Sequence, residues 1–305
     1  MRGGLVSDNR LMSSTIRWQA VVPPSWVHDL VSGGSPLTYP GHGFVALEVG
    51  WGEPDAYLRG HVPGAVYLDT NLIERPPLWH FVPDAELQAV LERFGITRAT
   101  TVVLYGDPMM GAARAAVAML YAGVDDVRLL DGGLPAWRAA GFDVETTPRA
   151  PVAVAAFGGA VPLRPRLVVD KAAVRRMIDD PAGSVVVCTR SWAEHVGEIS
   201  GYDAITACGR IRGSVWGHSG SDAHHVEDFE APDGTLRDAD ELAALWAASG
   251  ITGERHVAFY CGTGWRASLA LFHAWRLGWP QASLYDPGWV EWGQDPAMPV
   301  ETGPP

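Results

Sequence analysis

The chain contains an internal duplication, and this feature constrains its fold more than any other. Residues 84–106 align with residues 239–261 without a gap, at a constant spacing of 155 residues. At the same spacing Asp131 returns as Asp286, Gly133 as Gly288 and Trp137 as Trp292. Self-similarity at a fixed long spacing indicates two copies of one structural unit. We therefore expect two domains of the same fold, arranged in tandem.

Each copy has the pattern of strands that alternate with helices. Short apolar runs, typical of buried parallel strands, occupy residues 45–49, 101–105, 185–187 and 256–260. Apolar residues at helical spacing, preceded by acidic residues and followed by glycine, occupy residues 87–94 and 242–248. This order predicts an α/β fold in which each domain has a mostly parallel sheet flanked by helices.

The length of the chain fits two domains. One hydrophobic core rarely grows beyond about 250–300 residues, and this chain has 305. A stretch rich in alanine, proline and glycine, without a clear period, indicates a linker at 150–166. We expect an N-terminal tail over 1–24, a first domain over 25–149, this linker, and a second domain over 167–305.

Composition narrows the possible partners and the cellular location. The formal charge of −12 argues against nucleic acid or an anionic membrane as a partner, whereas a small anion needs only a local positive pocket. No apolar run is long enough to span a bilayer, and the N-terminus lacks the apolar region of a signal peptide. Cys188, Cys208 and Cys261 are too scattered for a disulfide framework, and His224 and His225 have no ligand partners at suitable spacing. We expect a cytoplasmic protein without a metal site.

One loop carries the residues most suited to chemistry. The strand at 256–260 is followed by Cys261, Gly262, Thr263, Gly264, Trp265 and Arg266, and then by a predicted helix. The carboxyl end of a parallel strand, beside the first turn of a helix, is where open α/β sheets bind ligands. Three features favour the nucleophilic thiolate of Cys261. They are the N-terminus of the helix, the loop N–H groups that the glycines allow to converge on one anion, and the cation of Arg266.

Three segments of the second half together resemble a known family. They are the C-G-T-G-W-R loop, the upstream G-R-I-x-G-S-V at 209–215 and the downstream D-x-G-W-x-E-W at 286–292. The combination is similar to the rhodanese sulfurtransferases in their tandem-domain form, over roughly residues 25–302. Residues 218–229 resemble most a branch of thiosulfate sulfurtransferases that has the same CGTGWR loop.

The resemblance implies an enzyme that transfers sulfane sulfur. Members take sulfur from a small anionic donor such as thiosulfate or mercaptopyruvate, hold it as a persulfide, here on Cys261, and pass it to cyanide, a thiol or a protein. Such a covalent intermediate divides the transfer into two steps and requires no cofactor. The alternative is a persulfide carrier that relays sulfur between proteins with little small-molecule turnover. The donor, the acceptor, the pathway and the oligomeric state stay open.

Loop length and the repeat refine this interpretation. Phosphatases of the same fold separate cysteine from arginine by five residues, whereas only four separate Cys261 from Arg266, and the smaller cradle suits sulfur. In the first copy Gly106 occupies the position of Cys261, so that copy has no nucleophile there. We expect the first domain to be catalytically inactive and structural.

Four other residues have both a functional and a structural interpretation. Arg190, which follows the strand at 185–187, either binds an anionic donor or ties the strand end to a carboxylate. Cys188 is either a resolving thiol for Cys261 or a buried filler, and the same question applies to Cys208. Trp265 either forms an apolar wall of the site or packs at the domain interface.

Overall fold

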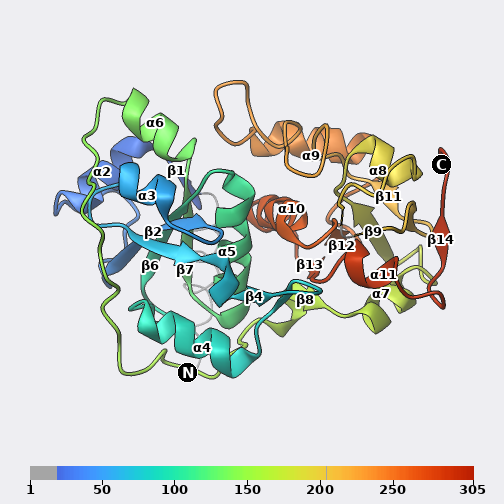
Figure 1. The fold of residues 1–305 in the computed structure, drawn as a ribbon, viewed down its shortest axis with the longest axis horizontal. Helices are drawn as coiled ribbons and strands as arrows, with labels where there is room; N and C mark the ends of the chain where they lie inside the picture. The colour runs from blue at the N-terminus through green and yellow to red at the C-terminus, as the bar shows by residue number, and fades with distance from the viewer. Residues whose placement is uncertain (1–18, 204) are drawn as a thin grey trace, which may run out of the picture.

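The computed structural model describes residues 19–203 and 205–305, which form two α/β domains side by side (Figure 1). The first domain has a parallel sheet in the order β1-β7-β6-β2-β3. Its strands are β1 (Val21–Val22), β2 (Phe44–Gly50), β3 (Val66–Asp69), β6 (Thr101–Tyr105) and β7 (Asp126–Leu130). Its helices are α2 (Pro24–Val31), α3 (Asp55–Arg59), α4 (Asp84–Arg93), α5 (Met109–Ala122) and α6 (Gly133–Ala139), with a 3-10 turn η1 (Thr70–Leu72).

The second domain repeats this arrangement. Its parallel sheet has the order β8-β13-β12-β9-β11, so that every strand has a counterpart in the first sheet. The strands are β8 (Val168–Val169), β9 (Ser184–Cys188), β11 (Val215–Trp216), β12 (His256–Tyr260) and β13 (Ala282–Tyr285). The helices are α7 (Lys171–Met177), α8 (Trp192–Val196), α9 (Ala239–Ala248), α10 (Trp265–Arg276) and α11 (Trp289–Trp292), and η2 (Pro165–Leu167) precedes β8. The predicted fold class and the duplication are confirmed.

The central strands are where the sequence predicted them. β6 and β12 have the predicted bounds, and every residue of β6 is buried. β6 pairs with β2 and β7, and β12 pairs with β9 and β13, all in parallel. A parallel strand covered on both faces is apolar throughout, which explains the continuous runs TVVLY and VAFY.

Each sheet lies between two layers of helices. In the first domain α4 and α5 cover one face, while α2 and α6 cover the other. In the second domain α9 and α10 cover the corresponding face, and α7 and α11 the opposite one. The predicted helices therefore form because their apolar sides have a sheet to cover.

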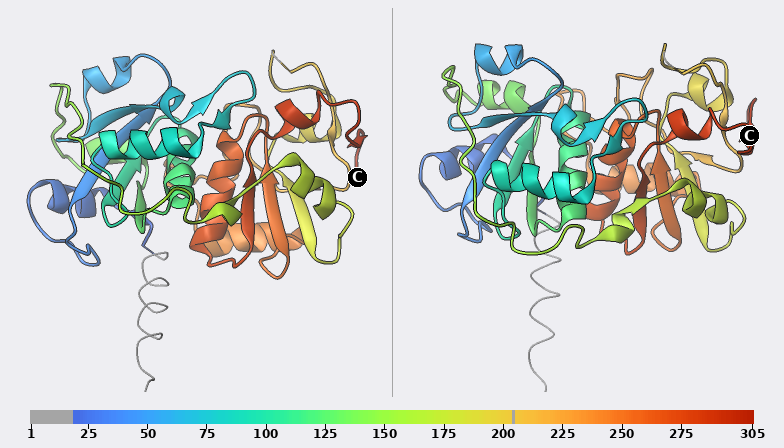
Figure 2. Two further views of the ribbon diagram at one scale, coloured as in Figure 1. Left: turned by 90° about the horizontal axis from the view of Figure 1, so that it is seen from below. Right: turned by 60° about the horizontal axis from the view of Figure 1, so that its bottom comes forward.

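The domains meet through helices that the duplication makes equivalent. α5 packs against α10, and the two lie next to each other in both views of Figure 2. The contact is close, since a Cβ added to Gly111 of α5 would lie 3.2 Å from the Trp265 ring. A hairpin of the first domain, β4 (Glu74–Arg75) and β5 (His80–Phe81), also reaches the second domain, as Phe81 N–H donates to Asp286.

The expected domain boundaries need correction. Residues 21–22 were expected in a tail, but they form β1, which pairs with β7 at the edge of the first sheet. The stretch 150–166 does connect the domains, yet it packs on the first one: Phe157 is fully buried, and its carbonyl accepts from Arg98 N–H. A short pair, β10 (Arg210–Ile211) and β14 (Val300–Glu301), lies beside the second sheet. Within the described part of the chain, no helix has the length and apolar character needed to cross a membrane.

Candidate active site

Cys261 follows the last residue of β12 and is fully buried. Its Sγ accepts a hydrogen bond from the backbone N–H of Gly264, at 3.1 Å. The loop carbonyls are held from the other side, since Trp289 N–H and Val290 N–H donate to the carbonyls of Cys261 and Gly262. The first turn of α11 thus fixes the loop while Gly264 faces the sulfur.

Two glycines make this loop geometry possible. Gly264 precedes α10 with a φ of +108°, a conformation that residues with a Cβ rarely adopt. A Cβ on Gly262 would overlap the ring of Tyr202, which covers the loop. A side chain is therefore excluded at both positions. At Gly264 the backbone conformation excludes it, and at Gly262 the close packing of the Tyr202 ring does.

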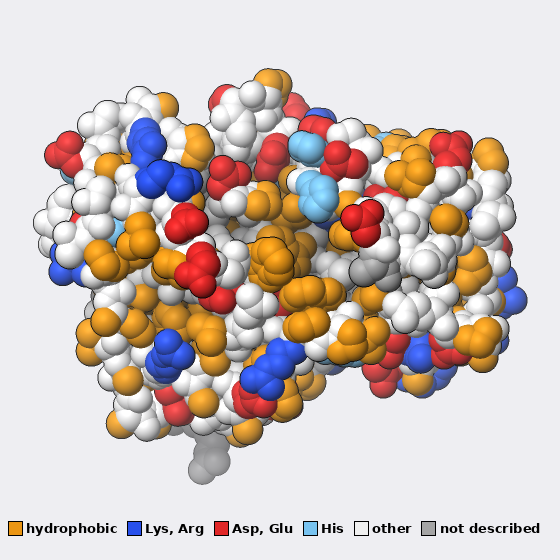
Figure 3. All heavy atoms as spheres, viewed as in Figure 1, with side chains coloured by type: hydrophobic (Ala, Val, Ile, Leu, Met, Phe, Trp, Pro, Cys, Tyr) orange, Lys and Arg blue, Asp and Glu red, His pale blue; other side chains and the backbone are white. Residues whose placement is uncertain are grey.

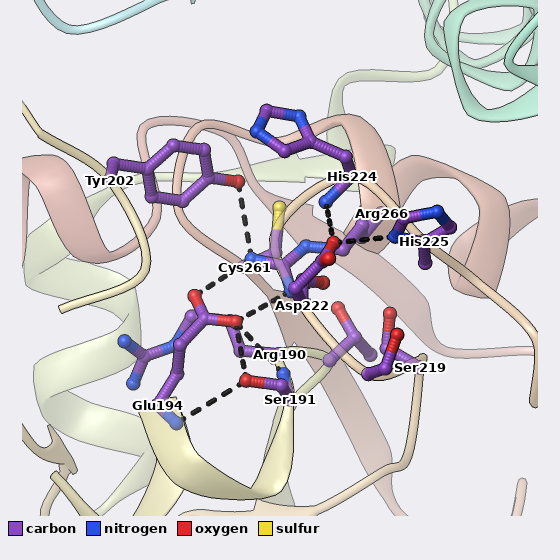
Figure 4. A network of polar contacts seen from close by, with 12 residues as sticks. Arg190, Ser191, Glu194, Tyr202, Ser219, Asp222, His224, His225, Cys261 and Arg266 are labelled. Carbon is purple, nitrogen blue, oxygen red and sulfur yellow. Dashed lines mark hydrogen bonds and ion pairs between the residues drawn. The ribbon is translucent and has the colours of Figure 1, made fainter. Parts of the chain in front are cut away.

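Arg266 turns to a carboxylate rather than to the sulfur. Its two Nη atoms donate to both oxygens of Glu194 at 2.8 and 2.9 Å, and also to the Asp222 carbonyl and the Tyr202 hydroxyl (Figure 4). Although burial acts to raise the pKa of Glu194, hydrogen bonds and charge from Arg266 hold it below the usual value. The sequence predicted Arg266 as a permanent cation that favours the Cys261 thiolate, and the structure pairs this cation with the buried Glu194.

Arg190 packs against Cys188 and Trp289 in the second domain. The side chain is fully buried, with Nε 3.4 Å from Cys188 Sγ and Nη2 donating to the Gly209 carbonyl. Its guanidinium also lies over the Trp289 ring, 4.6 Å from the centroid. Arg190 is as fully buried as Cys261, and its role in donor binding stays a prediction.

Cys188 and Cys261 lie on opposite sides of the second sheet. Cys188 packs with Tyr260 under α11, whereas Cys261 belongs to the core that α10 covers. Cys208 is exposed and lies in the loop before β10. The structure therefore does not bring either cysteine to Cys261, as a resolving thiol would require.

A cleft of about 900 Å³ lies between the domains beside the loop. Thr263 and Trp265 of the loop line it, and the first domain contributes Trp51 and Trp79. Figure 3 shows this hollow between the two halves, with acidic side chains on both sides and histidines near its rim. A volume of this size suits a small organic molecule. Within the described residues no group of three or more His, Cys, Asp or Glu is placed to hold a metal ion.

Trp265 lines the site and also packs at the domain interface, the two roles that the sequence left open. Its ring packs against Gly111 of α5 and also lines the cleft. Its Nε1 donates to Glu74 of the first domain at 2.6 Å. The indole is thus a wall of the site and a contact between domains.

The loop of the first domain has no nucleophile. Gly106 follows β6, and α5 begins at Met109 after Pro108. Gly106 lines the same cleft as Thr263. The first domain therefore contributes a wall of the cleft and not only support.

Sequence reasoning missed several side chains around the loop. Glu194 could have been found as part of a capping box, because Ser191 and Glu194 satisfy each other's backbone N–H groups at the start of α8. Tyr202, Glu74 and Arg114 carry no comparable signal, since each reaches the loop from a distant part of the sequence.

Comparison with known proteins agrees with this geometry. The family model for the rhodanese-like domain matches residues 47–140 and 170–295, one match in each domain. Thiosulfate sulfurtransferase YnjE of Escherichia coli is 47% identical over 98% of this chain and 68% of that protein. A probable 3-mercaptopyruvate sulfurtransferase of Pseudomonas aeruginosa is 32% identical over 81% of this chain and 86% of its own.

A solved structure is similar over nearly the whole chain. It is an anaerobic ergothioneine biosynthesis enzyme from Chlorobium limicola in complex with trimethyl histidine, with a TM-score of 0.91 and 42% identity. The match covers 95% of this chain and 71% of that one. The chain therefore belongs to the rhodanese family and is a sulfurtransferase with two rhodanese domains in tandem.

Proposed function

We propose that Cys261 carries the transferred sulfur as a persulfide. In the first step the Cys261 thiolate attacks the outer sulfur of the donor. With thiosulfate, a bond forms between Sγ and that sulfur, the S–S bond of thiosulfate breaks, and sulfite leaves with the electron pair. In the second step an acceptor thiolate attacks the sulfane sulfur, the Sγ–S bond breaks, and the Cys261 thiolate returns.

One observation carries this proposal: the N–H of Gly264 points at Sγ from the N-terminus of α10. A donor at this position stabilises a thiolate and also the anionic persulfide that replaces it. Gly262 and Gly264 provide the backbone, while Thr263 and Trp265 form the part of the cleft next to the sulfur. Arg266 acts through Tyr202 and Glu194, which it holds beside the loop.

Intact-mass spectrometry tests the persulfide directly. The protein is incubated with thiosulfate or with mercaptopyruvate, and then with cyanide. We expect a gain of about 32 Da, one sulfur atom, that is absent in Cys261→Ser and disappears with cyanide. If both donors leave the mass unchanged while the thiol can be alkylated, the persulfide proposal is wrong.

The charge of the cleft favours a cationic acceptor. Among the described residues that line it there is no lysine or arginine, while Asp107 of the first domain faces the cleft together with Glu227 and Glu230 of the second. Burial, and then the charges of Glu227 and Asp107, raise the pKa of Glu230, so carboxylates of both domains interact across the cleft. Indole rings beside carboxylates are suited to bind an organic cation, such as the trimethyl histidine bound by the Chlorobium relative.

Salt should change the rates of the two half-reactions in opposite directions. Because the Debye length falls from about 10 Å at 0.1 M salt to about 3 Å at 1 M, screening weakens both repulsion and attraction. We expect sulfur loading from thiosulfate, an anion, to accelerate with salt. Discharge to cysteamine, whose ammonium is attracted to the carboxylates, should slow with salt relative to discharge to 2-mercaptoethanol, which has no cationic group.

A pair of variants checks that the cleft causes this effect. Glu227→Gln combined with Glu230→Gln should weaken both salt dependences, whereas Glu254→Gln should not. Glu254 is the matched control because it is exposed and precedes β12, at the opposite end of that strand from Cys261. If cysteamine and 3-mercaptopropionate discharge the persulfide equally fast at low salt, the cationic acceptor is excluded.

The location of the protein remains a prediction. The expected cytoplasmic location follows from three cysteines that are all free in the structure. Fractionation of cells that produce the full chain would test it.

A further inference from the structure

We propose that Arg114, a residue of the inactive first domain, is a positioning residue for the active-site loop of the second. Arg114 lies in α5 and is fully buried. It makes contacts with both domains, and all of them lie next to residues that shape the loop around Cys261. The inference goes beyond the persulfide chemistry, because it assigns a role in that chemistry to the domain without the cysteine.

The guanidinium of Arg114 is shared between two carboxylates. Its Nε donates to Glu74 of the first domain at 2.8 Å, and Nη1 lies 2.6 Å from Asp286 of the second. Nη2 donates to the Trp79 carbonyl, and the whole group stacks on the Phe81 ring, 3.7 Å from its centroid. Every side of the guanidinium therefore has a fixed partner, which defines its position closely.

Glu74 connects this arginine to the active-site loop. One of its oxygens accepts from Arg114, and the other accepts from Nε1 of Trp265 at 2.6 Å. Burial raises the pKa of Glu74, while Arg114 and Trp265 act against this change. The carboxylate is thus held by one residue of each domain, and Trp265 is the first residue of α10.

Asp286 makes the second connection. Although burial acts to raise the pKa of Asp286, Arg114 and His80 hold it below the usual value. Its other oxygen accepts from Phe81 N–H at 2.7 Å. Asp286 follows β13, at the carboxyl edge of the sheet where Cys261 follows β12, so the pair spans the domain boundary beside the site.

The arginine also lies close to the loop itself. A Cβ on Gly264 would lie 2.7 Å from Arg114 Nη1 and 2.9 Å from the Asp286 carbonyl. The guanidinium therefore lies directly behind the residue whose N–H donates to Cys261 Sγ. Fixing Gly264 and Trp265 fixes the direction of this N–H, and a misplacement of about 1 Å can cost about 10²-fold in rate.

Another buried arginine provides a matched control. Arg128 is also fully buried in the first domain, with Nε 2.8 Å from Asp126 and its guanidinium 4.4 Å from the centroid of the Trp26 ring. It lies in β7 and contacts Thr38, away from the second domain. Arg114→Met and Arg128→Met therefore remove similar buried ion pairs, and only the first one touches the loop.

The experiment measures loading of Cys261 with thiosulfate in single turnovers, together with the melting temperature. Both Met variants should melt at a lower temperature. Arg114→Met should lower the maximal loading rate of folded protein by about 10²-fold, with little change in the half-saturating thiosulfate concentration. Arg128→Met should load at the wild-type rate. Arg114→Lys should recover stability but only part of the rate, because one ammonium cannot contact both carboxylates and the carbonyl in the same geometry.

Equal loading rates for Arg114→Met and Arg128→Met would overturn the proposal and assign Arg114 a structural role only. If Arg114→Met yields no folded protein, Asp286→Asn decides, because it weakens the hold on Arg114 at a residue outside the cleft lining. A lower maximal rate in folded Asp286→Asn supports the proposal, and an unchanged rate contradicts it. Loading of wild-type protein is measured first. If it acquires no sulfur at Cys261, the persulfide proposal itself fails.

Discussion

The loops after β6 and β12 begin from equivalent strands but differ in two atoms that matter for chemistry. After β12, Cys261 supplies Sγ, and Gly264, at a φ of +108°, supplies the N–H that faces it. After β6, Gly106 supplies no side chain, and Pro108, the residue before α5 as Gly264 is the residue before α10, has no N–H. The first copy therefore lacks the sulfur, and the residue before its helix cannot donate as Gly264 does. The two loops thus differ both in the nucleophile and in the backbone of the residue before the helix.

The largest expected effect comes from exchanging the two positions. Cys261→Ala should lower sulfur transfer by at least about 10³-fold, because no other thiol lies in the loop. Adding Gly106→Cys to this variant should not restore activity, since the new Cβ would overlap the Val49 carbonyl and Pro108 offers no N–H. Cyanide-dependent release of thiocyanate measures both variants. Recovered activity in the double variant would show that a cysteine alone is sufficient at this position.

A smaller effect should come from adding one methyl group to each loop. Gly262→Ala forces the Tyr202 ring away from the loop, and we expect loading to fall by about 10²-fold in protein that still folds. Gly106→Ala should instead lower the melting temperature, because its Cβ meets the backbone of β2. Loading rates and thermal unfolding of both variants distinguish the two sites. Equal loss of activity in both would mean that the loops have similar roles.

The domains should also differ in their response to acid. Burial, then nearby arginines, lowers the pKa of His195 and of His273 to about 3, and both residues belong to the second domain. The unfolded chain takes up these protons near pH 6.5, whereas the folded chain does not until about pH 3. Stability is therefore full above about pH 6.5 and falls with pH below it, by about 1.4 kcal/mol per pH unit for each histidine.

Urea unfolding at pH 7.5 and pH 5 tests this dependence. His273→Leu cannot take up a proton in the unfolded state, so it should lose less stability between these two pH values than wild-type protein. His28→Leu, in α2 of the first domain, is the comparison. An identical loss in wild-type protein and in His273→Leu would contradict the assignment.

The smallest effect on activity is expected at Cys188. Cys188→Ala should leave the loading rate unchanged, because this thiol lies on the other side of the sheet from Cys261. It should lower the unfolding free energy by about 1–3 kcal/mol, because buried Arg190 loses a partner. Cys208→Ala, an exposed position, should change neither quantity. A large loss of sulfur transfer in Cys188→Ala would restore the relay role.

The sequence predicted what is local and what is repeated. The bounds of β6 and β12 follow from apolar runs that recur at one spacing, and Cys261 follows from its place after such a strand. The partner of Arg266 could not be read in the same way, because Glu194 lies 72 residues away in the sequence. Contacts of this kind depend on tertiary packing, which decides where a charged side chain turns.

The same limit applies between the domains. Glu74 is 191 residues from Trp265, and no periodicity or spacing connects the two. The duplication predicted that the domains are alike, but it gave no information on how they face each other. The role of the first domain as a wall of the cleft therefore emerged only from the structure.

The packing of α5 against α10 has a consequence for the history of the chain. One hydrophobic core contains Ala112 and Ala116 of the first domain together with Ala270 and Ala274 of the second. A substitution that loosens this core in the first domain must then also loosen the half that carries Cys261. Purifying selection on the domain with Cys261 therefore also acts on the first domain, which cannot drift or be deleted as an independent module.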